Sequence, residues 1–169
     1  MKRFSRVITI IAATACVFIA AGSVSANEFS KQELTNEEIA VNFYNEVKKG
    51  GYEVVNTAEL KKWIDEKKDI ILVDTMPLEA SYKKNHLPKA LQMEFPIPEM
   101  TEIKPDVQDA LVKVLGIEKN KTIVFYCGFP KCTRSHNAAM WAKKLGYTNV
   151  YRYPGGIKAW MESGFSVEP

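Results

Sequence analysis

Residues 121–135 read KTIVFYCGFPKCTRS. Residues 121–126 form the clearest predicted strand in the chain, and this strand runs directly into Cys127. Beyond the loop, apolar residues recur at helical spacing up to Gly146, which predicts a helix. This helix face contains Ala138, Trp141, Ala142 and Leu145. The order of strand, short loop and helix predicts that Cys127 lies at the carboxyl end of a strand, where open parallel sheets collect their ligands.

Strands and helices alternate along the rest of the chain. A second buried strand is predicted at 69–74, where an apolar run stops at Asp74, and a third at 149–153. Residues 77–105 carry five of the eight prolines and are predicted as loop. Further helices are predicted at 35–49 behind a capping box that starts at Thr35, after Asn56, at 107–115 before Gly116, and at 157–163. We therefore expect an α/β fold, with a mainly parallel central sheet flanked by helices.

The first 26 residues have the three parts of a secretory signal peptide. A basic start is followed by an apolar run at 7–21 and by small residues that end at Ala26. This run of about 15 residues is shorter than the roughly 20 that a membrane-spanning helix needs. We therefore expect cleavage after Ala26 and a secreted, periplasmic location, with no membrane attachment afterwards. The predicted organisation is a signal peptide at 1–26, a helical extension at 27–51 and one domain at 52–169.

Removal of the signal peptide changes the charge and the cysteine count. The whole chain of 169 residues carries a formal charge of +3, but Lys2, Arg3 and Arg6 all lie in the signal peptide. The mature chain is then formally neutral, which argues against nucleic acid as a partner. Cys16 leaves as well, so Cys127 and Cys132 remain. Two cysteines are too few for a disulfide framework or a four-thiolate zinc site.

The residue types around Cys127 predict an activated thiol. A thiolate beside a helix N-terminus is stabilised by free N–H groups and by the helix dipole, so we expect a depressed pKa for Cys127. The N–H groups of a tight loop can also converge on one anion. Lys131 and Arg134 add positive charge nearby. The loop could therefore hold an activated sulfur and an oxyanion together.

Four segments in order make the chain similar to the rhodanese-like family of sulfurtransferases, over about residues 52 to 169. Leu72-Val73-Asp74 resembles the family's strand that ends in Asp. Residues 79–90, EASYKKNHLPKA, resemble its E-x-x-[FY]-x-x-G-H-[IL]-P-G-A segment. Residues 126–135 resemble its active-site loop, and residues 155–164 its closing G-G-x-x-A-W signature. The resemblance implies a rhodanese-like three-layer fold.

The resemblance also implies a persulfide mechanism without cofactor or metal. Cys127 would take sulfur from a small anionic donor such as thiosulfate and pass it to a thiol or to cyanide. Arg134 would attract the donor or stabilise departing sulfite, and Cys132 is a further candidate catalytic residue. The loop residues expected to bind the substrate are Gly128, Phe129, Pro130, Lys131, Thr133 and Ser135.

The chain departs from the family pattern at several positions. Cys132 stands where the sulfurtransferase loop has a basic residue or Thr, and the Arg-Ser pair comes two residues later, so the loop is longer. Met76 replaces an Arg after the first core strand, and Asn85 and Lys89 replace two glycines. Rhodanese-related phosphatases and arsenate reductases also have enlarged loops.

These departures leave three other functions open. Cys127 and Cys132 could form a redox-active disulfide, or Cys132 could resolve a persulfide on Cys127. The enlarged loop could serve an oxyanion reductase or a phosphatase. The domain could also bind sulfur species or a partner without catalysis. A metal site built from the two cysteines and His136 has an unusual spacing and lacks a fourth ligand.

Overall fold

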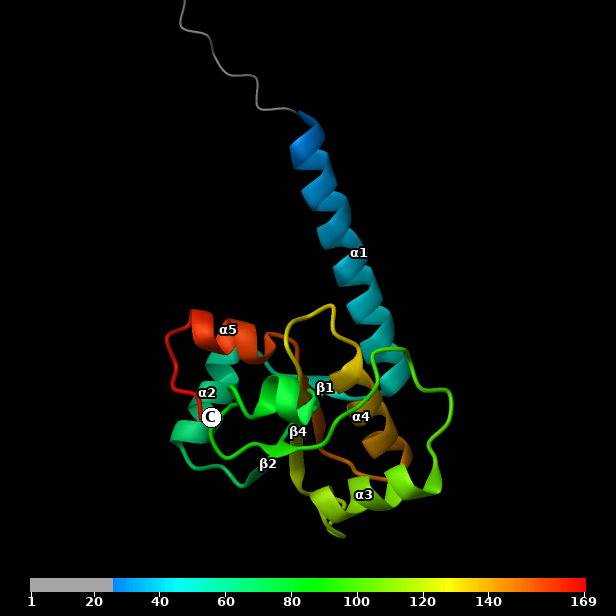
Figure 1. Cartoon of the computed structure of the whole chain (residues 1–169). Coiled ribbons are helices and arrows are strands. Elements are labelled where there is room, and N and C mark those ends of the chain that lie inside the picture. Colours follow the sequence, from blue (N-terminus) through cyan, green and yellow to red (C-terminus); the bar gives the residue numbers. More distant parts are fainter. Residues whose placement is uncertain (1–25) are drawn as a thin grey trace, which may run out of the picture.

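The computed structural model describes residues 26–169, which form a sheet between two layers of helices (Figure 1). The sheet contains β1 (Glu53–Val54), β2 (Ile70–Asp74), β3 (Leu91–Gln92), β4 (Thr122–Tyr126) and β5 (Val150–Tyr153). Its order is β1-β5-β4-β2-β3, and every neighbouring pair is parallel. The expected α/β fold with a parallel sheet is therefore confirmed.

The three central strands are the apolar runs that the sequence predicts. Asp74 at the end of β2 lies in register with Tyr126 at the end of β4, and Tyr126 with Tyr153 at the end of β5. The carboxyl ends of these strands therefore meet at one edge of the sheet, directly before Cys127. The outer strands β1 and β3 have two residues each, which is too short for an alternating pattern to reveal.

Helices cover both faces of the sheet and bury one apolar cluster on each. The helices are α1 (Ala26–Gly50), α2 (Thr57–Asp65), α3 (Pro105–Leu115), α4 (Arg134–Lys144) and α5 (Gly156–Glu162), with a single π-helical turn at Leu78–Tyr82. On one face, α3 and α4 pack against Phe125 and the end of α1. On the other face, α2 and α5 pack against Val124. The edge of the sheet at which β2, β4 and β5 end is therefore held by packed helices on both faces.

Local signals explain where most helices begin and end. The Asn56 side chain accepts a hydrogen bond from the Glu59 backbone N–H, 2.9 Å, and so caps α2 as predicted. Gly116 follows the end of α3 with φ of 76°, and Gly146 lies just after α4 with φ of 89°. These left-handed conformations favour glycine, so the predicted ends of both helices are confirmed.

The prediction for the start of α1 is wrong. The sequence predicts a start at the capping box of Thr35, but the helix begins at Ala26 and continues through that box to Gly50. No glycine or proline interrupts residues 27–49, so nothing in the local sequence stops the helix from extending. The N-terminal part of α1 projects from the body of the molecule, while its C-terminal end lies beside α4 (Figure 1).

The predicted signal peptide lies outside the described residues, except for its last residue, Ala26. Within residues 26–169, no helix combines the length and the apolar character that crossing a bilayer requires. The predicted limits of the extension at 27–51 and of the domain at 52–169 stay predictions.

Candidate active site

Cys127 lies at the carboxyl end of β4, where the chain leaves the sheet. Its side chain is 2% exposed, and the loop that follows reaches α4 at Arg134. The first turn of α5 fixes the start of this loop. The Ile157 N–H donates to the Cys127 carbonyl oxygen at 3.0 Å, and the Lys158 N–H donates to that of Gly128 at 3.2 Å.

Gly156 allows this close contact between α5 and the loop. A Cβ atom at position 156 would lie 2.1 Å from the Cys127 carbonyl oxygen, far inside van der Waals contact, and φ of Gly156 is 59°. The backbone of the loop therefore occupies the space of the missing side chain. Gly156 is the first residue of α5, and its missing side chain lets this helix approach the backbone of Cys127 and Gly128.

Cys127 and Cys132 are both free thiols, and the loop brings them into direct contact. The Cys127 Sγ lies 3.1 Å from the carbonyl oxygen of Cys132 and 3.2 Å from the Oγ of Ser135. Cys127 lies deeper, while the side chain of Cys132 is 9% exposed. The loop thus brings the two cysteines of the described chain together at one point.

The expectation of a depressed pKa for Cys127 is wrong in this state of the protein. Burial and contact with Cys132 raise the pKa of the Cys127 thiol, although the Ser135 hydroxyl and N–H lower it. The depressed pKa belongs to Cys132, at about 6, chiefly because the Cys127 thiol donates to its sulfur. The two thiols thus shift each other's pKa in opposite directions, in the sense that favours the proton on Cys127.

The backbone N–H groups of the loop also favour Cys132. The N–H groups of Arg134 and Gly128 stabilise its thiolate, and the Arg134 charge adds to the effect. Only the Ser135 N–H acts on Cys127 among these groups. The cradle expected to surround a persulfide on Cys127 is therefore partly filled by the Cys132 sulfur.

Arg152 on β5 is a site residue that sequence reasoning missed. Its guanidinium is fully buried, and its Nε donates to the Ser135 Oγ at 2.9 Å. Its Nη2 donates to the carbonyl oxygens of Cys132 at 2.9 Å and Pro130 at 3.3 Å. Because the Nε–H can only donate, the Ser135 O–H is left to point at the Cys127 sulfur. Arg152 thus holds the loop from beneath.

A chain of polar groups connects Arg152 to α1. Its Nη1 donates to the Glu46 carboxylate on α1 and to the Tyr52 hydroxyl, the latter at 3.2 Å. The Tyr52 hydroxyl in turn lies 2.9 Å from the Nδ1 of His136. Burial raises the pKa of Tyr52 to about 12, so this hydroxyl stays protonated while it shares a hydrogen bond with Nδ1. The His136 ring is therefore directed at Tyr52 and Glu99, away from the two thiols.

The model of the rhodanese-like domain matches residues 56–163. The chain belongs to the rhodanese-like family. The search of curated proteins found no match. The Cys127–Cys132 pair and the Ser135–Arg152 contact lie within the residues that this family model matches.

Solved structures with this rhodanese-like fold come from several bacteria. A Bacillus halodurans protein is 28% identical with a TM-score of 0.55, over 74% of this chain and 82% of that one. A homodimeric polysulfide-sulfur transferase from Wolinella succinogenes is 20% identical with a TM-score of 0.55, over 78% of this chain and 90% of that one. A Rhodopseudomonas palustris protein, described as a possible tyrosine phosphatase, is 23% identical with a TM-score of 0.53, over 77% and 93%. The last two likenesses show the fold alone.

Two pockets border the loop, and their walls include four of the predicted substrate-binding residues: Phe129, Pro130, Lys131 and Thr133. One pocket, of about 480 Å³, is mostly apolar, with Met76, Phe129, Cys132 and Arg134 in its wall. Arg134 also donates to Glu94 at 3.2 Å and to the Phe95 carbonyl oxygen. Cys132 is therefore the thiol that faces this pocket.

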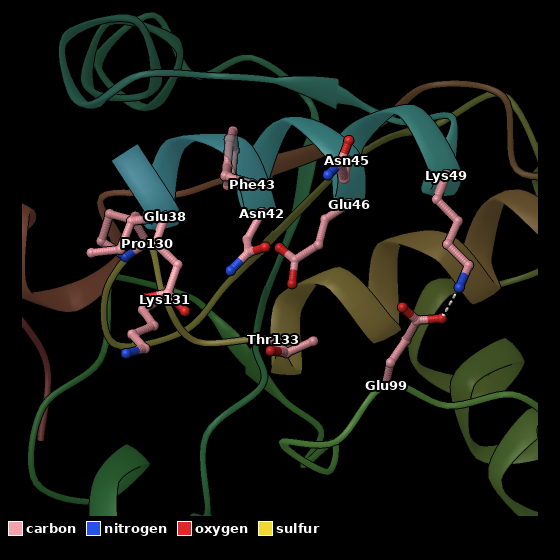
Figure 2. Close-up of a pocket in the computed structure, with 11 residues that line it drawn as sticks. Glu38, Asn42, Phe43, Asn45, Glu46, Lys49, Glu99, Pro130, Lys131 and Thr133 are labelled. Carbon is pink, nitrogen blue, oxygen red and sulfur yellow. Dashed lines mark hydrogen bonds and ion pairs between the residues drawn. The ribbon is translucent and has the colours of Figure 1, made fainter. Parts of the chain in front are cut away.

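The second pocket separates the loop from α1 and also has a volume of about 480 Å³. Figure 2 shows polar side chains of α1 directed toward the loop across this space. The lining includes Asn42, Glu46 and Lys49 from α1, and Pro130, Lys131 and Thr133 from the loop. Lys49 is paired with Glu99 across the pocket. The helix that precedes the matched region thus borders the active-site loop.

Proposed function

We propose that this rhodanese-like protein is an exported sulfurtransferase. It takes a sulfane sulfur from a small anionic donor such as thiosulfate and passes it, through a persulfide on Cys127, to a thiol or to cyanide. One observation carries the proposal: the Cys127 sulfur, at the end of β4, lies 3.2 Å from the Ser135 hydroxyl and 3.1 Å from the carbonyl oxygen of Cys132, whose own thiol has a lowered pKa. A buried thiol with a proton acceptor in contact can become a nucleophile without an external base.

The first step is a proton shift within the pair. The Cys132 thiolate accepts the proton of Cys127, and the Ser135 O–H and N–H then stabilise the new Cys127 thiolate. This thiolate attacks the outer sulfur of thiosulfate. The sulfur–sulfur bond of the donor breaks, and its electron pair leaves with sulfite. Arg134, in the wall of the apolar pocket, attracts the anionic donor.

Thiocyanate formation from thiosulfate and cyanide tests the proposal directly. We expect the purified protein to be active and Cys127→Ser to be inactive. Ile117→Ser, at an 86% exposed position between α3 and β4, serves as the surface control and should behave like the unchanged protein. Turnover by Cys127→Ser at the unchanged rate would contradict Cys127 as carrier. Inactivity of the unchanged protein, combined with hydrolysis of an aryl phosphate, would favour the phosphatase instead.

Export is proposed from residues 1–26 and is tested separately. We expect periplasmic extracts of producing cells to contain a chain that starts at Asn27, as read by N-terminal sequencing. Recovery of an uncleaved chain from the cytoplasm would contradict this part of the proposal.

A further inference from the structure

The two thiols differ in what they face. Cys132 lines the apolar pocket of about 480 Å³ together with Phe129 and Arg134, whereas Cys127 lies behind it at the end of β4. The Cys127 Sγ lies 3.1 Å from the backbone carbonyl oxygen of Cys132, so the two cysteines are in direct contact. Any sulfur atom loaded on Cys127 therefore has a second thiol beside it before an external acceptor arrives.

The loop offers little stabilisation to a lasting persulfide. A sulfur carrier needs free N–H groups to hold the negative outer sulfur. Here the N–H groups of Gly128 and Arg134 face the Cys132 thiolate. The outer sulfur of a Cys127 persulfide would have to share these donors with the Cys132 sulfur. A persulfide on Cys127 would therefore lie next to the nucleophilic sulfur of Cys132 and would receive few hydrogen bonds from the loop N–H groups.

We propose that Cys132 resolves the persulfide on Cys127, so that the protein releases the sulfane sulfur as hydrosulfide and closes a Cys127–Cys132 disulfide. This inference rests on the proposed function, because it needs the sulfur to reach Cys127. It adds a reductase activity: two cysteine sulfurs are oxidised and one sulfane sulfur is reduced. When no external acceptor is present, a residue of the same loop takes its place.

The atoms and the single proton of the pair balance. After the donor step, Cys127 carries a persulfide anion and Cys132 holds the proton. The proton passes to the outer sulfur, which leaves Cys132 as a thiolate. Cys132 then attacks the inner sulfur, the Sγ of Cys127, and forms the disulfide. The bond to the outer sulfur breaks, and its electron pair and the proton leave together as hydrosulfide.

The geometry of the loop permits the disulfide. The Cys132 N–H donates to the Phe129 carbonyl oxygen at 3.0 Å, so the chain turns back between the two cysteines. The two cysteines are already in direct contact, and a disulfide requires their Sγ atoms to approach to about 2 Å. The return to the dithiol requires an external dithiol reductant, which would attack Cys132 because this sulfur borders the open pocket.

A single-turnover experiment without acceptor tests the inference. The fully reduced protein, freed of reductant, receives one equivalent of thiosulfate, and sulfite, sulfide and the intact protein mass are measured. We expect one equivalent each of sulfite and sulfide, with the loss of two hydrogen atoms from the protein. The Cys132→Ser variant should release sulfite but no sulfide and gain one sulfur atom. Ile117→Ser should match the unchanged protein.

The outcomes separate this inference from the proposed function. Sulfite release together with a stable gain of one sulfur atom by the unchanged protein would overturn the resolving role of Cys132 and leave the sulfurtransferase intact. No sulfite at all would overturn both. If Cys132→Ser does not fold, peptide mapping of the unchanged protein decides: a Cys127–Cys132 disulfide formed with sulfide supports the inference, and its absence overturns it.

Discussion

The Nε of Arg152 lies 2.9 Å from the hydroxyl oxygen of Ser135, and both side chains are fully buried. The same hydroxyl lies 3.2 Å from the Cys127 sulfur. A cation from β5 therefore acts on the thiol through one intervening hydroxyl. This relationship makes Arg152 a positioning residue, and the first prediction tests it.

Arg152→Lys should keep the positive charge but lose the hydrogen bonds that position the loop beside Cys127. A lysine has no planar fork and cannot serve Ser135 and the carbonyl oxygens of Pro130 and Cys132 together. We expect sulfur transfer to fall by about 100-fold, as small misplacements at reacting atoms do. The pH profile of Cys127 alkylation should also move to higher pH, which a purely structural role would leave unmoved. Unchanged kinetics would exclude the positioning role.

Glu46→Gln should destabilise the whole domain, although Glu46 lies on α1 and outside the matched family region. The change removes the carboxylate that neutralises the buried Arg152. We expect a loss of about 3 kcal/mol in the free energy of unfolding, measured with urea. Glu38→Gln is the matched control, because Glu38 lines the same pocket from an exposed position on α1. Equal stabilities of the two variants would contradict the prediction.

Ser135→Ala should weaken the nucleophile. It removes the O–H that points at the Cys127 sulfur and leaves the Arg152 Nε–H without its acceptor. We expect a further rise in the pKa of Cys127, a loss of about 1–3 kcal/mol in stability and about a tenfold slower reaction with thiosulfate. Rates of sulfite release across pH measure the effect. A rate that matches the unchanged protein at every pH would remove Ser135 from the site.

Gly156→Ala and Gly116→Ala separate steric contact from backbone strain. Both glycines have positive φ, at 59° and 76°. A Cβ at 156 would meet the Cys127 carbonyl oxygen at 2.1 Å, whereas one at 116 would meet nothing within 4 Å. We expect about 1 kcal/mol of destabilisation at 116 and more than about 3 kcal/mol at 156, together with loss of activity. Similar melting temperatures for the two variants would contradict the role assigned to Gly156.

His136 should make stability depend on pH in the acid range. Burial and the Arg152 charge lower its pKa from 6.5 to about 4, so between these values the unfolded chain binds a proton that the native protein does not. Stability therefore falls as the pH drops from 6.5 to 4, by up to about 3 kcal/mol. In His136→Gln this part of the pH dependence should disappear. An identical slope in both proteins would contradict the assignment.

The sequence predicted the parts of the fold that depend on local patterns. The apolar runs of β2, β4 and β5 and the glycines after α3 and α4 are local signals, and the structure has these elements. The edge strands β1 and β3 exist only because a neighbouring strand pairs with them. The early start of α1 was missed because Thr35 has the same side chain whether it caps a helix or lies inside one.

The site shows a similar division. Cys127 and Cys132 could be named from the sequence because thiols near a strand end have a recognisable chemistry. The charge distribution between them could not, because it depends on burial and on which N–H groups face which sulfur. Arg152 was missed because a charged residue within a strand usually points to solvent. The sequence did hold one signal: Arg152 lies two residues before Pro154, near the carboxyl end of its predicted strand, and the carboxyl ends of parallel strands share the edge of the sheet at which Cys127 lies.

The bond between Arg152 and Glu46 spans 106 residues of sequence. Closing a loop of this length has an entropic cost, which the chain recovers only when α1 packs on the rest of the molecule. A chain shortened to the residues that the family model matches would therefore lack the carboxylate partner of the buried guanidinium under the loop.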